Sequence, residues 1–503
     1  MLESFGLLWG GFAVALTPMH IALMIGGVLL GLVVGVLPGL GAPNGVSLLI
    51  PLTFSMDPIS AIILLASMYW GALFGGSTTS ILFNIPGEPS SVATTFDGYP
   101  MARNGQATRA LSLAFLSAGL GALIGVVVIT LLSGWAAGFA LRFGTPEFFA
   151  VYFLAFCAFI GMGSSAPMKT LVSLLLGLVL SSVGMDNVTG SLRLTFGFNE
   201  LLGGISFLVI VIGLFGIGEI LVTIQDGLRF RGVASRIDIR EVFRTAAELP
   251  RYWATLVRSA ITGIWMGITP GGPTAASFMS YGLARQWSKT GAPFGSGRPE
   301  GIVAPETADH SAGTSAMLPM LALGVPSSAT AAVMMGGLMI WGLTPGPMLF
   351  VTQSDFVWGF IASMYVANIV AVVLVLATVP LFASLLRIPF AIIGPIIVAI
   401  CFVGAYTVSN ATFDLWILLI AGLLGFAFSK LGYPLAPLIL AMVLGDKAEN
   451  AFYQSMILSD GSLTIFFSNP LVATIMTIAL LLLLAPQLIK FATGRRAKLP
   501  AEE

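Results

Sequence analysis

The stretch GVLPGLGAPNG, from Gly35 to Gly45, and the longer stretch MYWGALFGGSTTSILFNIPGEPSSVATTFDGYPMARNG, from Met68 to Gly105, decide the fold. Both are apolar enough to lie in a membrane, but proline, glycine, serine and threonine interrupt them too often for a continuous helix. Backbone that breaks at membrane depth must have its N–H and C=O groups satisfied by protein or by a water-filled cavity. These stretches are therefore predicted to line a pathway rather than to face lipid.

A second version of both stretches follows later, as GITPGGPTAAS from Gly267 to Ser277 and GTSAMLPMLALGVPSSATAAVMMGGLM from Gly313 to Met339. Pro270 lies 232 residues after Pro38, and Pro326 lies 240 residues after Pro86, which indicates one duplication with small insertions. Paired, interrupted hydrophobic segments are typical of the binding site of a secondary transporter. We expect an all-α polytopic membrane protein of about 10–12 transmembrane helices, with re-entrant or broken helices and two homologous halves. We interpret the halves as inverted repeats, while the residues alone leave a parallel arrangement open.

Composition makes lipid the main solvent of this chain. Of its 503 residues, 57% are hydrophobic and 9% are charged, and the mean hydropathy is +0.98. A soluble protein carries roughly a quarter of its residues as charged side chains. The formal net charge is zero, which argues against nucleic acid as a partner, because a basic face is needed for that. The chain is expected to be a multi-pass protein of the lipid bilayer.

An arginine-rich segment divides the chain into a first membrane repeat (residues 1–224), a linker (225–258) and a second repeat with a C-terminal tail (259–503). The linker holds Arg229, Arg231, Arg236, Arg240, Arg244, Arg251 and Arg258. Basic residues favour the cytoplasmic side, so the linker and the tail are both predicted to be cytoplasmic. Two apolar segments, 45–54 and 434–445, are too short to cross upright and are interpreted as hairpins.

The proline breaks are the first candidates for a ligand site. Pro38, Pro86, Pro270 and Pro326 have structural roles, because a helix that ends there exposes carbonyls and one that restarts exposes amides. Amides at a helix start attract a carboxylate, whereas free carbonyls suit a bare cation. For each serine or threonine nearby, helix capping or close helix packing is the alternative to ligand contact. The predicted substrate-binding residues are Gly39, Asn44, Ser77, Thr78, Thr79, Asn84, Gly87, Ser90, Ser91, Gly271, Thr274, Thr314, Ser327 and Ser328.

Ionisable residues near the breaks are a sharper signal, because charge at membrane depth marks a pathway, an ion or proton site, or a structural pair. Glu88 is interpreted as stabilising a first helical turn, and Asp97 as pairing with Arg103 across a turn. Glu306 has no basic neighbour in sequence, so Glu306, Asp309 and His310 are the candidates for a coupling ion or proton.

Sodium is favoured over protons as the coupling ion. Freed carbonyls near Pro38, Gly39, Pro270 and Gly271 offer neutral oxygens for a sodium ion, together with Asn44, Thr274 and the hydroxyls of residues 77–80. The acids and histidine of the 306–310 segment are the argument for protons. No organic cofactor is expected. The chain has neither an HExxH zinc motif nor a phosphate-binding GxxxxGK[ST] loop, so it is not expected to be an enzyme.

Several motifs resemble the large membrane subunit of the tripartite tricarboxylate transporters, the TctA family: GVLPGLG with PNG, YWGALFGGS, NIPGEPSSVATTFDGYPMARNGQA, APETADH, LGVPSSATAA and GLTPGP. The similarity spans nearly the whole chain. Two departures from the family pattern lie in the predicted site and concern the substrate and the coupling ion. Pro326-Ser327-Ser328 stands where the family usually has Pro-Gly-Ser, and Asp309-His310 stands where it usually has Asn-Asn after the glutamate.

The resemblance implies a secondary active importer of organic carboxylates, tricarboxylate or dicarboxylate, in the bacterial inner membrane. It also implies two protein partners, a small membrane subunit of about four helices and a periplasmic solute-binding protein. A passive channel or scaffold subunit of a membrane complex is the alternative.

Overall fold

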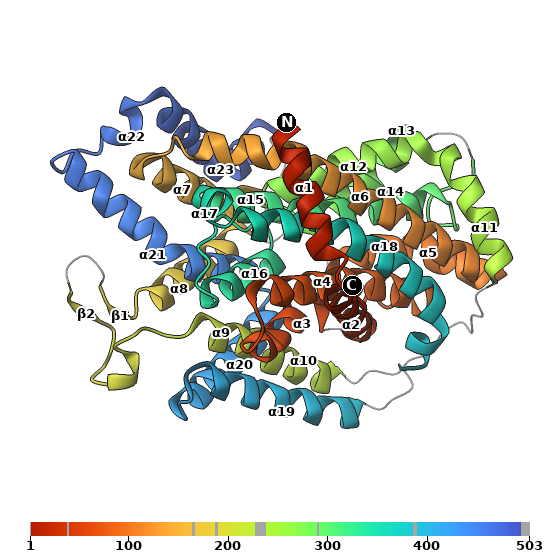
Figure 1. Cartoon of the computed structure of the whole chain (residues 1–503), viewed down its shortest axis with the longest axis horizontal. Coiled ribbons are helices and arrows are strands. Elements are labelled where there is room, and N and C mark those ends of the chain that lie inside the picture. Colours follow the sequence, from red (N-terminus) through yellow and green to blue (C-terminus); the bar gives the residue numbers. More distant parts are fainter. Residues whose placement is uncertain are drawn as a thin grey trace. The chain divides into compact units, whose positions relative to one another are not determined.

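The computed structural model describes residues 2–37, 40–162, 166–186, 190–226, 238–288, 291–385 and 390–493 (Figure 1). These residues are almost entirely helical. The strands among them are two residues long, β1 (Gly184–Met185) and β2 (Leu192–Arg193), and they pair antiparallel. The predicted all-α polytopic fold is confirmed.

The chain forms two compact units, residues 1–141 with 206–430 and residues 142–205 with 431–503. The helices of the first unit are α1 (Leu2–Ala15), α2 (Pro18–Val36), α3 (Gly41–Leu49), α4 (Pro58–Phe83), α5 (Val92–Met101), α6 (Ala107–Ala140), α9 (Phe207–Val211), α10 (Gly218–Asp226), α11 (Ile239–Glu248), α12 (Trp253–Ile268), α13 (Gly272–Trp287), α14 (Glu300–Ser315), α15 (Met317–Leu323), α16 (Ala329–Ile340), α17 (Pro347–Thr352), α18 (Ser354–Leu385), α19 (Phe390–Ser409) and α20 (Phe413–Leu431). Single turns between them are η1 (Ile50–Thr53), η2 (Pro89–Ser91), η3 (Ala102–Gln106), η5 (Ile212–Ile217) and η6 (Leu249–Tyr252).

In the described part of the chain, the second unit holds the strand pair and the helical elements α7 (Thr145–Met162), α8 (Pro167–Ser181), the turn η4 (Asn199–Leu201), α21 (Leu435–Leu458), α22 (Ile465–Ser468) and α23 (Pro470–Thr493). Each sequence half contributes to both units, so the units cut across the predicted division at 225–258. The predicted division separates two repeats of the sequence and not two compact units of the structure, so it stays a prediction.

Six helices of the described part are long and apolar enough to cross a membrane: Pro18–Val36, Pro58–Phe83, Pro89–Ala140, Phe207–Gln225, Ser354–Val379 and Phe413–Leu431. Shorter apolar helices of 10–17 residues accompany them. The predicted short hairpin at 434–445 is wrong, because these residues belong to α21, a helix of 24 residues. The segment 45–54 does form short pieces, the end of α3 and the turn η1.

The helices break at the four predicted places. α2 ends at Val36 and α12 ends at Ile268, and the chain turns into α3 and α13 with Gly41 at φ +55° and Gly272 at φ +63°. α4 and α15 end at left-handed residues, Asn84 (φ 59°) and Gly324 (φ 65°). The left-handed conformation is common just after a helix because it allows the last carbonyls to be satisfied.

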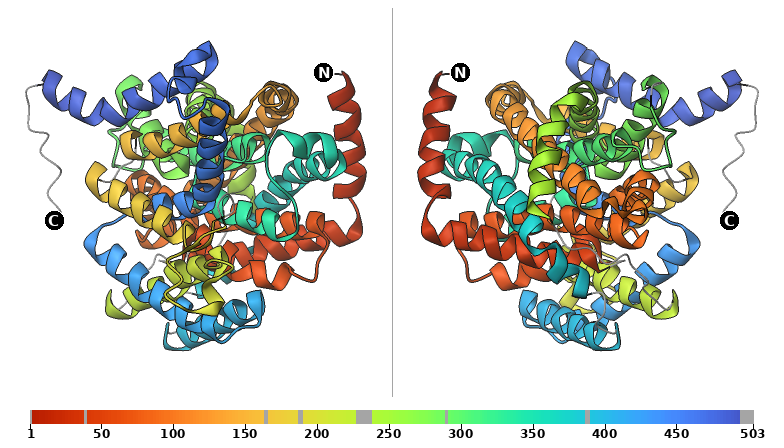
Figure 2. Two further views of the ribbon diagram at one scale, coloured as in Figure 1. Left: turned by 90° about the vertical axis from the view of Figure 1, so that its left-hand side faces the viewer. Right: turned by 90° about the vertical axis from the view of Figure 1, so that its right-hand side faces the viewer.

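Glycines allow α2 and α4 to pack closely. A Cβ built on Gly31 or Gly35 of α2 would collide with the α4 backbone, and one on Gly71 of α4 would collide with the α2 backbone at Val28. Small residues at four-residue spacing allow membrane helices to approach in this way. On another side of this unit, α1 lies against α18 (Figure 2).

The helices that restart after the breaks pack across the two sequence halves. α3, after the first break, contacts α16, which follows the break at Pro326. α13, after the break at Pro270, contacts η2, which follows the break at Pro86. Each half thus provides one restarting helix to each contact, and the four helix starts are brought into one region of the first unit.

Candidate functional site

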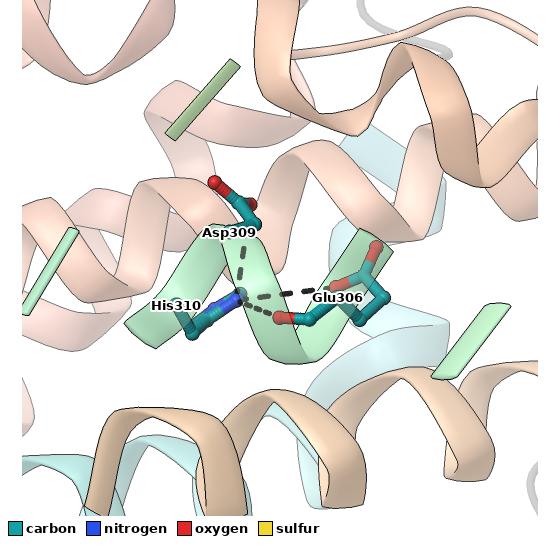
Figure 3. A group of neighbouring side chains, drawn as sticks. All are labelled: Glu306, Asp309 and His310. Atoms are coloured by element: carbon teal, nitrogen blue, oxygen red, sulfur yellow. Dashed lines mark hydrogen bonds and ion pairs between the residues drawn. The ribbon is translucent and has the colours of Figure 1, made fainter. Parts of the chain in front are cut away.

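The helix α14 carries Glu306, Asp309 and His310 into the interior of the first unit, where it packs against α6, α12 and α13 (Figure 1). The three side chains are 0–1% exposed. Figure 3 shows the side chains of Glu306 and Asp309 near the same ring nitrogen of His310. Residues three and four apart share one face of a helix, so the APETADH sequence places all three groups together.

The carboxylate of Glu306 is held by two hydroxyl groups from different elements. Ser77 of α4 donates to Oε2 at 2.8 Å, and Thr94 of α5 donates to Oε1 at 2.5 Å. Both oxygens therefore act as acceptors, which suits an ionised carboxylate.

The ring of His310 approaches both acids with the same nitrogen atom. Its Nδ1 is 3.3 Å from the backbone oxygen of Glu306, 3.8 Å from Oδ2 of Asp309 and 4.0 Å from Oε2 of Glu306. The other ring nitrogen, Nε2, has no hydrogen-bond partner among the described residues. One side-chain atom from each of the three groups lies within 4.8 Å of the other two.

The carboxylate of Asp309 is the least satisfied group of the cluster. Ser90 of η2 lies beside it, and the hydroxyl of Tyr69, from α4, is close to both Asp309 and Glu88. Neither oxygen of Asp309 nor the hydroxyl of Tyr69 has a hydrogen bond of good geometry within the described part of the chain. Buried polar atoms without partners are rare in proteins and point to a ligand, a water or an ion.

Glu88 caps a helix of the neighbouring break. Its Oε1 accepts from the backbone N–H of Ala42 at the start of α3, and its side chain is 5% exposed. Glu88 thus caps the start of α3, whereas the expected role concerned the helix that restarts after Pro86 and Gly87. Within its own turn η2, the hydroxyl of Ser91 donates to the backbone oxygen of Glu88 at 2.8 Å and accepts from Ser80 at 2.9 Å.

The second half has a similar arrangement without the carboxylate. Ser328 lies 240 residues after Glu88 and is neutral; its hydroxyl accepts from the N–H of Ala331 at 3.2 Å and caps α16. Ser327 donates to the backbone oxygen of Gly267 near the end of α12. A Cβ at Gly272 would stand 3.4 Å from Cβ of Ser328, but no side chain of the described residues caps the start of α13.

Several predicted residues have local roles. The hydroxyls of Thr78 and Thr79 bond to carbonyls of their own helix, at Phe74 and Gly76, and Thr314 accepts from Trp70 at 3.2 Å. The remaining predicted residues are placed as follows: Asn44 is buried in α3, Asn84 is exposed after α4, Thr274 is in the first turn of α13, Pro270 and Gly271 precede α13, Pro326 is buried before α16, and Pro38 and Gly39 lie outside the described residues.

Gly87 faces protein rather than an open space. A side chain there would meet the backbone oxygen of Gly35, and Thr79 Oγ1 at 2.8 Å. Among the hydroxyls expected at a sodium site, Ser77 donates to Glu306 and Ser80 donates to Ser91, and both oxygens keep their lone pairs. A sodium site at the carbonyls near Pro270 and Gly271 stays a prediction.

The predicted pairing of Asp97 with Arg103 is wrong. Asp97 is fully buried and accepts from the N–H groups of Gly295, Gly297 and Arg298 at 2.7–3.0 Å, and from the hydroxyl of Tyr281 at 3.0 Å. The guanidinium of Arg103 lies over the ring of Tyr99 instead, at 5.9 Å. Asp97 thus anchors the connection between α13 and α14, which is about 200 residues away in sequence.

Sequence reasoning missed Tyr69 and Thr94. Helical spacing was the available signal, because Tyr69 and Ser77 are eight residues apart on α4, and Ser90 and Thr94 are four apart. Residues at these spacings share a helix face.

Apolar helices and buried acids at broken helices define a multi-pass membrane protein with an internal polar site. The chain matches the model described as "Tripartite tricarboxylate transporter TctA family" over residues 21–440. It belongs to the TctA family and is a subunit of a tripartite tricarboxylate transporter. That family is a family of transporters and not of enzymes, and its systems include membrane and binding-protein partners.

Two relatives from Agrobacterium vitis are similar in sequence. The chain is 37% identical over 471 residues to an "Uncharacterized 52.8 kDa protein in TAR-I ttuC' 3'region", covering 93% of each chain. It is 36% identical over 219 residues to an "Uncharacterized protein in TAR-II ttuC' 3'region", covering 43% of this chain and 90% of the relative. No solved structure matches.

Proposed function

We propose that this chain is the translocating subunit of a secondary active importer of organic carboxylates, tricarboxylate or dicarboxylate, in the bacterial inner membrane. It works with a small membrane subunit of about four helices and with a periplasmic solute-binding protein. A gradient of Na+ or H+ drives the import. The alternative, a passive channel or scaffold, requires neither broken helices nor buried acids.

The observation that carries the proposal is the difference between the starts of α3 and α13. Glu88 places a carboxylate on the amide of Ala42 at the start of α3, whereas among the described residues no side chain bonds to the first amides of α13, which lie near the neutral Ser328. Free amides and the positive end of the helix dipole favour an anion. We infer that a carboxylate of the substrate binds at α13 as Glu88 binds at α3.

The contact between α13 and η2 extends this site toward the polar cluster. Ser90 on η2 and Thr274 on α13 supply hydroxyl groups beside the helix starts. The other proposed serines have partners within the chain: Ser328 caps α16, Ser91 donates to the backbone oxygen of Glu88, and Ser327 donates to that of Gly267 in α12. They shape the site by holding the breaks, while the backbone amides bind the ligand.

A carboxylate added at Ser328 tests this site. Ser328→Glu would place a second internal carboxylate at α13, as Glu88 does at α3, and should abolish uptake by the reconstituted complex. Ser328→Gln has the same size without the charge and serves as the matched control. Uptake is measured in proteoliposomes that contain both membrane subunits and the binding protein.

The expected result is loss of uptake in Ser328→Glu with substantial uptake in Ser328→Gln. Equal uptake by the two variants would place the substrate elsewhere. If both variants matched the wild type, the scaffold alternative would gain support, because a partner subunit would then carry the path.

A further inference from the structure

We propose that Asp309 is a proton-binding residue that couples carboxylate import to a proton gradient, with Tyr69 and His310 as positioning residues. The proposal rests on the proposed function and names its coupling ion. Its basis is a group of buried acids that form no ion pair with lysine or arginine in the described part of the chain.

Three acids lie close together in this interior: Glu306 and Asp309 on α14 and Glu88 ahead of η2. None of them forms an ion pair with lysine or arginine in the described part of the chain, and the nearest basic group is the imidazole of His310. Uncompensated charge in a medium of low dielectric is expensive. Glu306 receives two hydroxyl donors and Glu88 receives the amide of Ala42, so Asp309 is the acid that needs a cation or a proton.

The surroundings of Asp309 favour a proton over a sodium ion. A sodium ion is bound by several oxygen ligands, but the ring of His310, whose Nδ1 is 3.8 Å from Oδ2 of Asp309, offers only nitrogen, which is not a ligand for hard cations. A protonated carboxyl group, by contrast, needs one acceptor. The hydroxyl of Tyr69, which is almost fully buried and has no hydrogen-bond partner in the described part of the chain, belongs to a side chain next to Asp309 and can accept this hydrogen bond.

The packed elements present few other titratable groups to Asp309. α14 itself presents Glu306 and His310, α4 presents Tyr69, and the segment before η2 presents Glu88. α6 approaches α14 through Gly121 and Gly125, and α12 approaches it through Gly263 and Gly267. Asp97 of α5 and Tyr281 of α13 hydrogen-bond to each other near the start of α14.

Coupling follows from charge. A substrate carboxylate at α13 lies next to η2, whose Ser90 is beside Asp309. A proton taken from outside water by an Asp309 oxygen turns the carboxylate into a neutral carboxyl group and removes one repulsive charge. By linkage, the proton and the substrate then favour each other's binding equally. On the cytoplasmic side the O–H bond breaks, the proton returns to water, and the restored charge weakens substrate binding.

The test uses the complete complex in proteoliposomes with radiolabelled citrate, or with the dicarboxylate that the binding protein retains if citrate is not bound. Accumulation is driven by an acid-outside pH gradient without sodium, and separately by a sodium gradient at equal pH. Exchange of labelled for unlabelled substrate at equal pH is measured in parallel, because it needs no net proton movement. The variants are Asp309→Asn, which keeps the shape of the side chain, and Tyr69→Phe.

The wild type should accumulate substrate in the pH gradient. Asp309→Asn should lose about tenfold or more of this accumulation, keep its exchange activity, and show no dependence of exchange on pH. Tyr69→Phe should keep exchange and shift the pH of half-maximal accumulation. Asp57→Asn is the matched control, because Asp57 is an exposed cap of α4 and asparagine caps equally well.

Accumulation by Asp309→Asn at the wild-type level, loss of exchange in this variant, or wild-type accumulation driven by sodium alone would each overturn the proton site. A failure of the proposed function looks different: the wild type would then accumulate no carboxylate under either gradient.

Discussion

At the scale of single residues, the hydroxyl groups around Glu306 separate structural from functional serines and threonines. Ser77 and Thr78 are adjacent on α4, but only Ser77 reaches the Glu306 carboxylate, whereas Thr78 bonds to Phe74 of its own helix. Hydrogen bonds to charged groups contribute about 1.5–3 kcal/mol, and a bond to the helix's own carbonyl contributes less. Neighbouring positions with the same chemistry therefore make a controlled comparison.

We predict that Ser77→Ala lowers the thermal stability of the purified protein and that Thr78→Val does not. The first change leaves one oxygen of a buried carboxylate without a donor, at a cost of about 1–3 kcal/mol. The second keeps the shape and removes a hydroxyl that the helix does not need. Thermal unfolding in detergent measures both. Equal midpoints would mean that the Ser77 bond to Glu306 is not formed in solution.

At the scale of elements, glycines of α2 allow it to pack closely against α4, the helix that carries Tyr69 and Ser77. A Cβ at Gly31 would collide with the backbone of α4, whereas a Cβ at Gly26 meets nothing within 4 Å. We predict that Gly31→Ala destabilises the protein by about 1–3 kcal/mol, because a tightly packed contact tolerates no added methyl group. Gly26→Ala should be neutral or slightly stabilising, since alanine favours the helix. Thermal unfolding and expression level measure the pair, and a similar loss in both would contradict the close α2–α4 contact.

A second prediction at this scale concerns α11, which packs against α6. Arg109 bonds to both oxygens of Glu248 at 3.2 and 2.5 Å, and the Tyr252 hydroxyl donates at 2.7 Å. Glu248→Gln should raise the rate of amide hydrogen exchange across residues 239–248 by about fivefold, which corresponds to a loss of ~1 kcal/mol in the free energy of local opening. Glu241→Gln is the control, because its carboxylate is 3.8 Å from Arg244, which is 82% exposed. Unchanged exchange in Glu248→Gln would show that this pair does not hold α11.

The same pair predicts a pH dependence. Burial raises the pKa of Glu248, but the hydrogen bonds from Arg109 and Tyr252 outweigh it and hold the pKa below its ordinary value. A carboxylate with a lowered folded-state pKa stabilises the fold at pH above its unfolded value and loses that contribution as pH falls through the folded value. The protection of the α11 amides from hydrogen exchange should therefore be complete at neutral pH and should decrease only in strong acid.

At the scale of the whole molecule, the sequence predicted what depends on local chemistry. Proline, glycine and the spacing of apolar residues were enough for the helical membrane fold and for the four breaks, because proline and glycine act on their own turn of the chain. The burial of Glu306, Asp309 and His310 near these breaks also followed from their position in an apolar sequence.

Contacts between distant segments could not be predicted. Glu88 reaches Ala42, 46 residues away, and Ser77 reaches Glu306, 229 residues away. The predicted pair of Asp97 and Arg103 failed because sequence proximity was the only information, while the amides that bind Asp97 come from another helix connection. Such pairings depend on how helices pack, which a single sequence does not specify.

The central claim is that this chain carries an ion-driven path for an organic carboxylate. The most direct test is the ratio of internal to external substrate in proteoliposomes that contain the complete complex, with the binding protein outside. With an imposed Na+ or H+ gradient, the account predicts accumulation above the external concentration. This accumulation should collapse when an ionophore dissipates the gradient or when the binding protein is omitted. Equilibration to the external concentration and no further, with or without a gradient, would contradict the account and identify a passive channel.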